Sequence, residues 1–226
     1  MKREMGKNGN NAHTYTPALL DTKLGYPMAC RLRIMYKRTM KEDWECLENV
    51  NIKKFARFIG KIFKMKVPKI RLIKEKKMKK KYGETGLYGV CEVEYGKCKK
   101  ILLEKEMVKE GNGGLIYFVL LHELRHCWQV TDYQKYYGEQ EDTPNLQALR
   151  EADAQAFAEL IMYYLFEYSY SYEEHSKAER QQIEFQKNEI RLGLWEQIKK
   201  YYRFHGGFRG RGEIRRIDRE TYGRKK

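Results

Sequence analysis

The chain has 226 residues, 42% of them hydrophobic, and a formal net charge of +15. This length suits one domain with a sizeable core, and no stretch resembles a signal segment or reaches the roughly 18 apolar residues of a membrane span. Five cysteines without a CxxC pair argue against a secreted disulfide framework. We therefore expect a soluble, cytoplasmic protein with reduced thiols and no membrane partner.

The charge is distributed unevenly along the chain. Residues 53–81 contain 14 Lys or Arg and one acid, and residues 203–226 contain nine basic residues and three acids. Residues 139–160 instead contain six acids and one Arg. A run of like charge is commonly a solvated surface, and it also attracts nucleic-acid phosphates. Both interpretations stay open for the basic segments, so nucleic acid is a candidate partner.

The first part of the chain predicts one helix and one short strand. Residues 1–30 contain Gly, Asn, Pro and Thr with little periodicity and predict a flexible lead-in. Over 50–66, apolar residues recur at helical spacing with Lys and Arg between them, which predicts an amphipathic helix. Residues 70–73 predict a short strand, and the Lys-rich residues 74–81 predict a linker.

The middle part predicts a β-hairpin followed by a buried helix. Residues 86–95 alternate between apolar and polar side chains, and residues 101–103 supply a partner strand. The glycines of 111–114 break the chain. The apolar run 115–121 then begins a buried helix.

The last part predicts two long helices and a tail. A polar loop over 131–145 precedes a helix over 146–168, and another helix spans 173–202 with Gly193 as a weak point. Residues 205–226, which contain a short Arg/Gly/Phe segment, predict a basic flexible tail. The order of helices and strands predicts an α+β fold.

The buried helix contains the motif HExxH, as His122-Glu123-Leu124-Arg125-His126. Residues four apart lie one turn apart on the same helix face, so both imidazoles can reach one tetrahedral Zn²⁺. Glu123 is then placed to take a proton from water at the metal, as the catalytic base. The alternative is a pair of structural histidines, although buried imidazoles beside a carboxylate need a partner such as a metal.

A catalytic zinc site needs a third protein ligand, and the next helix offers two acids. Glu151 shares a face with Ala154 and Ala158, small residues that permit close approach to the HExxH helix. Asp153 points to a different side of the helix, and only packing decides between the two carboxylates. Gln155 is a candidate hydrogen-bond partner of a ligand histidine. An acidic helix start, favoured by the helix dipole, is the alternative explanation for both acids.

Three cysteines lie near these elements. Cys91 and Cys98 flank the turn predicted over 95–97, which allows them to form half of a metal site or to remain separate thiols. Cys127 follows His126 directly and is turned about 100° away from it around the helix, which favours a packing role over a ligand role.

HExxH followed, after a loop, by the run from Glu151 to Ala158 resembles the gluzincin metallopeptidases, most closely the ImmA/IrrE-like group. The resemblance implies that Glu151 is the third zinc ligand, that Asp153 is the second acid of the pattern, and that Gln155 replaces Asn or Asp. Arg125 stands where the group often has Gly, and the usual Pro after the Phe-Ala segment is missing.

The resemblance, which covers 86–162, implies a zincin-like core of one helix, a short antiparallel sheet, the HExxH helix and the third-ligand helix. We expect this core over 31–170, a C-terminal helical extension over 171–204 and the basic tail. The implied function is that of a zinc-dependent metallo-endopeptidase acting on a protein substrate, with a transcriptional repressor of a mobile element as the implied class. The alternatives are a basic nucleic-acid-binding protein with a structural or inactive zincin core, and a zinc hydrolase acting on a non-peptide bond.

Overall fold

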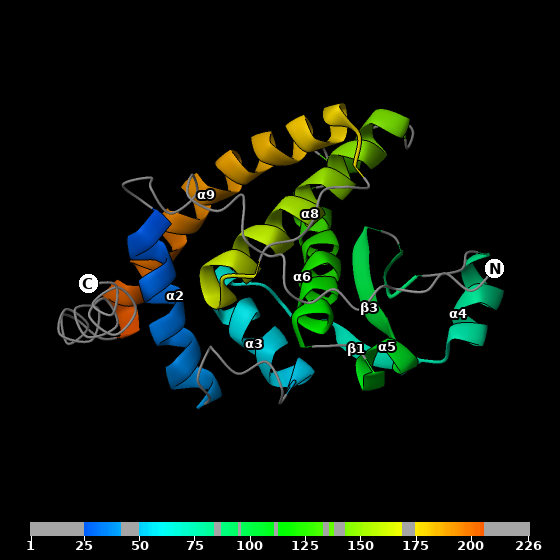
Figure 1. The fold of residues 1–226 in the computed structure, drawn as a ribbon, viewed down its shortest axis with the longest axis horizontal. Helices are drawn as coiled ribbons and strands as arrows, with labels where there is room; N and C mark the ends of the chain where they lie inside the picture. The colour runs from blue at the N-terminus through cyan, green and yellow to red at the C-terminus, as the bar shows by residue number, and fades with distance from the viewer. Residues whose placement is uncertain are drawn as a thin grey trace, which may run out of the picture.

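Helix α6 (Gly113–Gln129), which carries the HExxH motif, lies between a small sheet and a layer of helices (Figure 1). Within the described residues the fold is α+β, mostly helical with one three-stranded mixed sheet. The predicted lead-in up to residue 24 and the predicted tail from residue 206 lie outside these residues. The computed structural model describes residues 25–41, 50–83, 87–94, 96–110, 113–132, 136–137, 143–168 and 175–205.

The sheet confirms the predicted hairpin and corrects the predicted antiparallel arrangement. Strand β2 (Gly89–Glu94) pairs antiparallel with β3 (Lys97–Glu104), whereas β1 (Lys69–Ile73) pairs parallel with β3, in the order β1-β3-β2. The chain reverses once through helix α4 (Glu75–Tyr82) and again at the hairpin, so β3 runs in the direction of β1. A short helix, α5 (Lys105–Glu110), follows β3.

The Lys-rich residues 74–81 form most of α4 and are not the predicted linker. Lysine is a good helix former, and contacts with the sheet stabilise a helix that would be too short to form alone. Met78 is its buried side chain. Gly83 ends the helix with φ of 77°, a left-handed conformation that glycine adopts at little cost.

Glu92 of β2 attaches α4 to the hairpin. Its carboxylate accepts hydrogen bonds from Lys81 and Tyr82 of α4, and it pairs with Lys100 of β3 at 2.7 Å. Burial alone would raise the pKa of Glu92, but the hydrogen bonds from Lys100, Lys81 and Tyr82 outweigh burial and lower the pKa to about 2. The acid is therefore ionised at neutral pH and holds the lysine-rich helix against the sheet.

Three further helices were expected from the periodicity and are confirmed, with small changes at their ends. Aromatic side chains join two of them, α3 and α8, to α6: the ring of Phe55 stacks on Tyr117 with centroids 4.0 Å apart, and the ring centroid of Phe166 lies 5.8 Å from that of Tyr117. None of the helices in the described part of the chain is long and apolar enough to cross a membrane. The three helices are α3 (Ile52–Phe63), α8 (Pro144–Phe166) and α9 (Lys177–His205).

Helix α2 (Gly25–Met40) is not predicted by the sequence pattern and begins inside the expected lead-in of 1–30. Tertiary contacts hold it in place. The buried Arg33 donates through Nε to the backbone oxygen of Tyr164 at 2.9 Å and through Nη2 to Glu167 at 3.0 Å. Because Tyr164 lies in the last turn of α8, the arginine also satisfies one of the carbonyl groups that a helix end leaves unpaired.

Candidate metal centre

The two histidines of the HExxH motif lie one turn apart on α6 and face the same point. Their Nε2 atoms are 3.0 Å apart, near the about 3.3 Å expected for two nitrogens on one tetrahedral Zn²⁺. Glu151 of α8 reaches this point, with carboxylate oxygens 3.3 Å from Nε2 of His122 and 3.5 Å from Nε2 of His126. The structure thus brings together the three side chains predicted to bind zinc.

The first turns of α8 position Glu151. Thr143 caps the helix by accepting a backbone hydrogen bond in the first turn, and Pro144 suits the first helical position. Ala154 and Ala158 are fully buried, so α8 packs closely on α6. The side chain of Glu151 is 57% exposed, and the centre is therefore accessible from solvent on this side.

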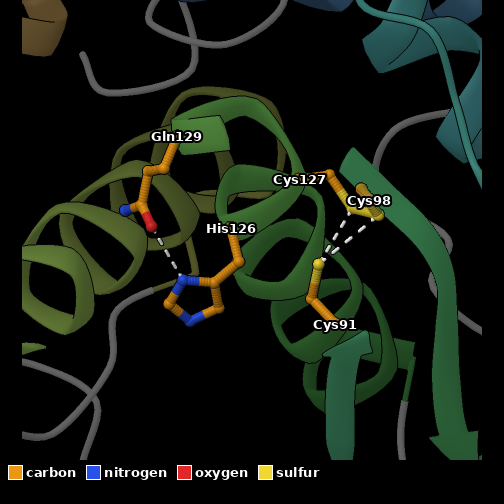
Figure 2. The surroundings of a disulfide bond; sticks show 5 residues. All are labelled: Cys91, Cys98, His126, Cys127 and Gln129. Atoms are coloured by element: carbon orange, nitrogen blue, oxygen red, sulfur yellow. Dashed lines mark hydrogen bonds between the residues drawn. A yellow bond between two sulfur atoms is a disulfide. The ribbon is translucent and has the colours of Figure 1, made fainter. Parts of the chain in front are cut away.

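Gln129, which is not among the predicted site residues, orients the ring of His126 (Figure 2). Its Nε2 donates to the carbonyl of Arg150 and to the carboxylate of Asp153, at 2.8 Å in each case. Because both partners are acceptors, the side-chain oxygen of Gln129 faces Nδ1 of His126, at 2.9 Å. With the Nδ1 proton directed to Gln129, a neutral His126 presents the lone pair of Nε2 to the centre, as a metal ion there would need.

A local signal for Gln129 exists in the sequence. It lies three residues after His126 on the same helix, a spacing at which side chains meet. Its partner across the helix pair, Asp153, has no such signal, because contact between α6 and α8 depends on packing.

Asp153, the alternative ligand, does not lie beside the imidazoles. It is fully buried and accepts hydrogen bonds from Nε and Nη2 of Arg125, at 2.6 and 2.8 Å, and from the hydroxyl of Tyr136 at 3.2 Å. The guanidinium of Arg125 also lies 4.4 Å from the ring centroid of Trp128. The arginine that departs from the family pattern therefore neutralises Asp153, and packing leaves Glu151 as the acid at the centre.

The prediction that Gln155 holds a ligand histidine is corrected by the structure. Its Nε2 donates to Oε1 of Glu159 at 2.8 Å. Glu159 in turn pairs with the buried Lys187 of α9, at 2.6 Å. Gln155 therefore belongs to the contact between α8 and α9, and Gln129 performs the predicted task from the motif helix itself.

Glu123 lies beside the imidazoles in a buried position, with 7% of its surface exposed. The backbone N–H of Cys91 in β2 donates to its carboxylate. Burial raises the pKa of Glu123, and the nearby histidines and the Cys91 N–H offset only part of this rise. A carboxyl group with increased proton affinity suits a residue that takes up and returns protons near neutral pH.

Strand β2 passes so close to Glu123 that residue 89 must be small. A Cβ built on Gly89 would lie 2.8 Å from Cγ of Glu123 and 2.8 Å from Cγ1 of Val119. Such an approach is closer than packed side chains tolerate, so the glycine permits direct contact between the strand and the acid.

The carboxylates of Glu151 and Glu123 favour a positive charge at the imidazoles. Burial alone would raise the pKa of Glu151, but hydrogen bonds with His122 and His126 outweigh it and hold the pKa well below its ordinary value. Burial would likewise lower the pKa of His126, but Glu151 and Glu123 raise it. Two imidazoles and a carboxylate with ligand atoms within 4.8 Å of one another form a donor set of the kind zinc prefers.

No family model, curated protein or solved structure matches the chain. The resemblance to the ImmA/IrrE-like group therefore rests on the motif residues, and the geometry of those residues carries the functional argument.

Two isosteric substitutions distinguish the candidate ligand Glu151 from Asp153, its buried neighbour on α8. We expect Glu151→Gln to contain one zinc ion fewer per chain than the unchanged protein, because it removes a charged ligand. Asp153→Asn should contain as many zinc ions as the unchanged protein but bind zinc at the histidines about 10- to 100-fold more weakly through Gln129, and should lower the free energy of unfolding by about 3 kcal/mol because Arg125 loses its partner. Zinc content by mass spectrometry and chemical denaturation measure the two effects. Zinc retained in Glu151→Gln and lost in Asp153→Asn would contradict this assignment.

Two glycine substitutions test the contact between β2 and Glu123. Gly89→Ala should lower the free energy of unfolding by about 1–3 kcal/mol, because the added methyl group overpacks against Glu123. Gly193→Ala is the control: its Cβ meets nothing within 4 Å, and alanine should stabilise α9 by up to about 1 kcal/mol. Urea denaturation measures both. Equal effects of the two substitutions would show that β2 does not press on Glu123.

Proposed function

We propose that this chain is a zinc-dependent metallo-endopeptidase with a zincin-like core, in which His122, His126 and Glu151 hold the ion and Glu123 is the catalytic base. The convergence of the two Nε2 atoms and the Glu151 carboxylate beside a buried Glu123 carries the proposal. The exposed side of Glu151 supports a catalytic centre over a closed structural one, since substrate and water need access.

The side chains have distinct tasks in the proposed reaction. A Zn²⁺ ion held there would supply Lewis acidity, which polarises a carbonyl group and lowers the pKa of water. Glu123 takes the proton of the attacking water and passes it to the leaving amine. Gln129 keeps Nε2 of His126 available by fixing the proton on Nδ1.

The position of β2 supports a peptide as the substrate. In the order β1-β3-β2 this strand lies at an edge of the sheet, with one side paired to β3. An extended peptide can pair with the other side of an edge strand through main-chain hydrogen bonds. Since Gly89 and Cys91 of this strand contact Glu123, a peptide aligned along β2 would pass beside the proposed base.

The proposed substrate class is a transcription repressor, as the family resemblance implies. The basic composition of the chain fits a protease that works near DNA, because attraction to phosphates raises its local concentration there. Release of genes of a mobile element is then the proposed consequence of cleavage.

The isosteric change Glu123→Gln tests the mechanism. We expect the variant to keep zinc and to lose hydrolysis by on the order of 10²- to 10⁴-fold, because the amide cannot take up the proton. The substrate probe is a library of unstructured peptides incubated with the zinc-loaded full chain, and new termini are counted by mass spectrometry.

The matched control is Glu189→Gln, which changes an exposed glutamate of α9 away from the centre. It should cleave like the unchanged protein. Cleavage by Glu123→Gln at the control rate, or zinc-loaded protein that cleaves none of the peptides, would contradict the proposed function.

A second candidate function is nucleic-acid binding, and the helical form of α4 favours it. Its lysines are exposed around the buried Met78, so one short helix presents a concentrated positive surface. The paired change Lys77→Glu and Lys80→Glu should weaken binding to a DNA duplex, and the slope of its salt dependence should fall by about one unit for each phosphate that the protein no longer neutralises. Lys177→Glu, on exposed α9 surface, is the control.

We expect nucleic-acid binding by the lysines of α4 to be independent of the metal centre. Fluorescence anisotropy at several salt concentrations, with and without a zinc chelator, measures the effect. Binding that disappears on chelation alone, or that the α4 changes do not affect, would contradict a nucleic-acid function of α4.

A further inference from the structure

A second group of metal-ligating side chains lies on another side of α6 from the imidazoles. Figure 2 shows His126 and Cys127 leaving the helix in different directions, with Cys127 pointing toward Cys98 and Cys91. The sulfur of Cys91 is 3.4 Å from that of Cys98 and 3.2 Å from that of Cys127, and Cys98 and Cys127 are joined as a disulfide. The disulfide corrects the reduced thiols expected for Cys98 and Cys127, whereas Cys127 is buried as expected and Cys91 is a free thiol.

The three cysteines come from three elements that the fold brings together. Cys91 lies on β2 opposite Ile101, and Cys98 lies on β3 opposite Val93, so the two are diagonal neighbours across the hairpin. Cys127 lies on α6, which packs on both strands. The sulfur atoms therefore meet where the hairpin contacts the helix.

We propose that Cys91, Cys98 and Cys127 form a second metal centre, distinct from the histidine centre, which binds Zn²⁺ when the thiols are reduced. Soft thiolate ligands select thiophilic ions, of which zinc is the commonest in structural sites. With Zn–S bonds of about 2.3 Å, tetrahedral coordination places sulfur atoms about 3.8 Å apart. Reduction frees the sulfur atoms of Cys98 and Cys127 to move apart to this distance, and the distances of 3.4 and 3.2 Å from Cys91 need to open by about 0.4 and 0.6 Å.

A metal ion would be bound by all three sulfur atoms, whereas the disulfide joins two of them. Each thiol gives up its proton to solvent as the metal binds, and no oxidation state changes. Interconversion of the dithiol and the disulfide by exchange with a low-molecular-weight thiol and its disulfide instead moves two electrons and two protons: oxidation of Cys98 and Cys127 reduces one small-molecule disulfide to two thiols and leaves Cys91 as a thiol. In the described residues the group contains three ligand atoms, so water or another small ligand completes the coordination.

The centre joins the hairpin to α6 beside the proposed catalytic base. Cys91 contributes its sulfur to the cluster and its backbone N–H to Glu123. Two residues earlier on the same strand, Gly89 packs against Glu123. A metal ion bound by the three sulfur atoms would therefore hold β2 at the distance from Glu123 that the histidine centre requires.

Cobalt binding tests the proposal, because thiolate coordination of Co²⁺ gives a near-ultraviolet charge-transfer absorption that histidine and carboxylate ligands do not. The full chain is reduced, freed of metal without oxygen, and titrated with Co²⁺. We expect the absorption in the unchanged protein and in the double variant His122→Ala and His126→Ala. The absorption should be lost in Cys91→Ser. This variant should also contain one zinc ion fewer per chain than the control variant Cys30→Ser.

The double histidine variant separates this centre from the proposed catalytic one. If the reduced, unchanged protein shows no charge-transfer absorption with Co²⁺, the proposal of a sulfur centre is wrong, whereas the proposal of a histidine centre is unaffected. Unchanged absorption in Cys91→Ser would also overturn it.

A second measurement needs no variant and so does not depend on the folding of Cys91→Ser. In the unchanged protein, zinc should slow modification of Cys91, Cys98 and Cys127 by a thiol reagent, with each site identified by mass spectrometry. Modification of these three at the same rate with and without zinc would overturn the proposal.

Discussion

The buried charge of Asp153 is the constraint on which the arrangement around the candidate centre depends. A carboxylate removed from water is costly unless charged and polar groups surround it. Arg125, Gln129 and Tyr136 do so, and two of these three belong to α6, the helix with the HExxH motif. The same interaction therefore fixes α8 against α6, takes Asp153 out of competition for a metal, and directs the oxygen of Gln129 toward His126.

Helix α6 contributes to two candidate groups of metal-ligating side chains because its faces meet different neighbours. One face turns His122 and His126 toward α8, where Glu151 lies at the exposed edge. The next residue, Cys127, is rotated by about 100° and meets the hairpin. Glu123 lies between these surroundings, close enough to the imidazoles for their charge to influence it and in contact with β2. Two neighbours thus influence Glu123: the histidines affect its pKa through their charge, and β2 limits its position by packing.

Several elements of the fold follow from local pattern, and others do not. The hairpin follows from the alternation of apolar and polar residues, and the long helices follow from apolar residues at helical spacing. Both patterns are local to the segment that forms the element. Helix α2 depends on distant contacts, above all Arg33 with the end of α8. The parallel pairing of β1 with β3 depends on how α4 returns the chain. A Lys-rich segment such as 74–81 is compatible with a linker or a helix until Glu92 of the neighbouring strand attaches it.

By itself, the sequence determined the pair of imidazoles and the adjacent Glu123, because spacing along one helix places them without help from the rest of the chain. It also limited the candidate third ligand to two acids of α8. Only the tertiary structure placed one of them, Glu151, at the imidazoles, since Arg125 pairs with Asp153. The meeting of three cysteines, distant in sequence, was likewise decided by the packing of the hairpin on α6, because no local spacing specifies contact between separate elements.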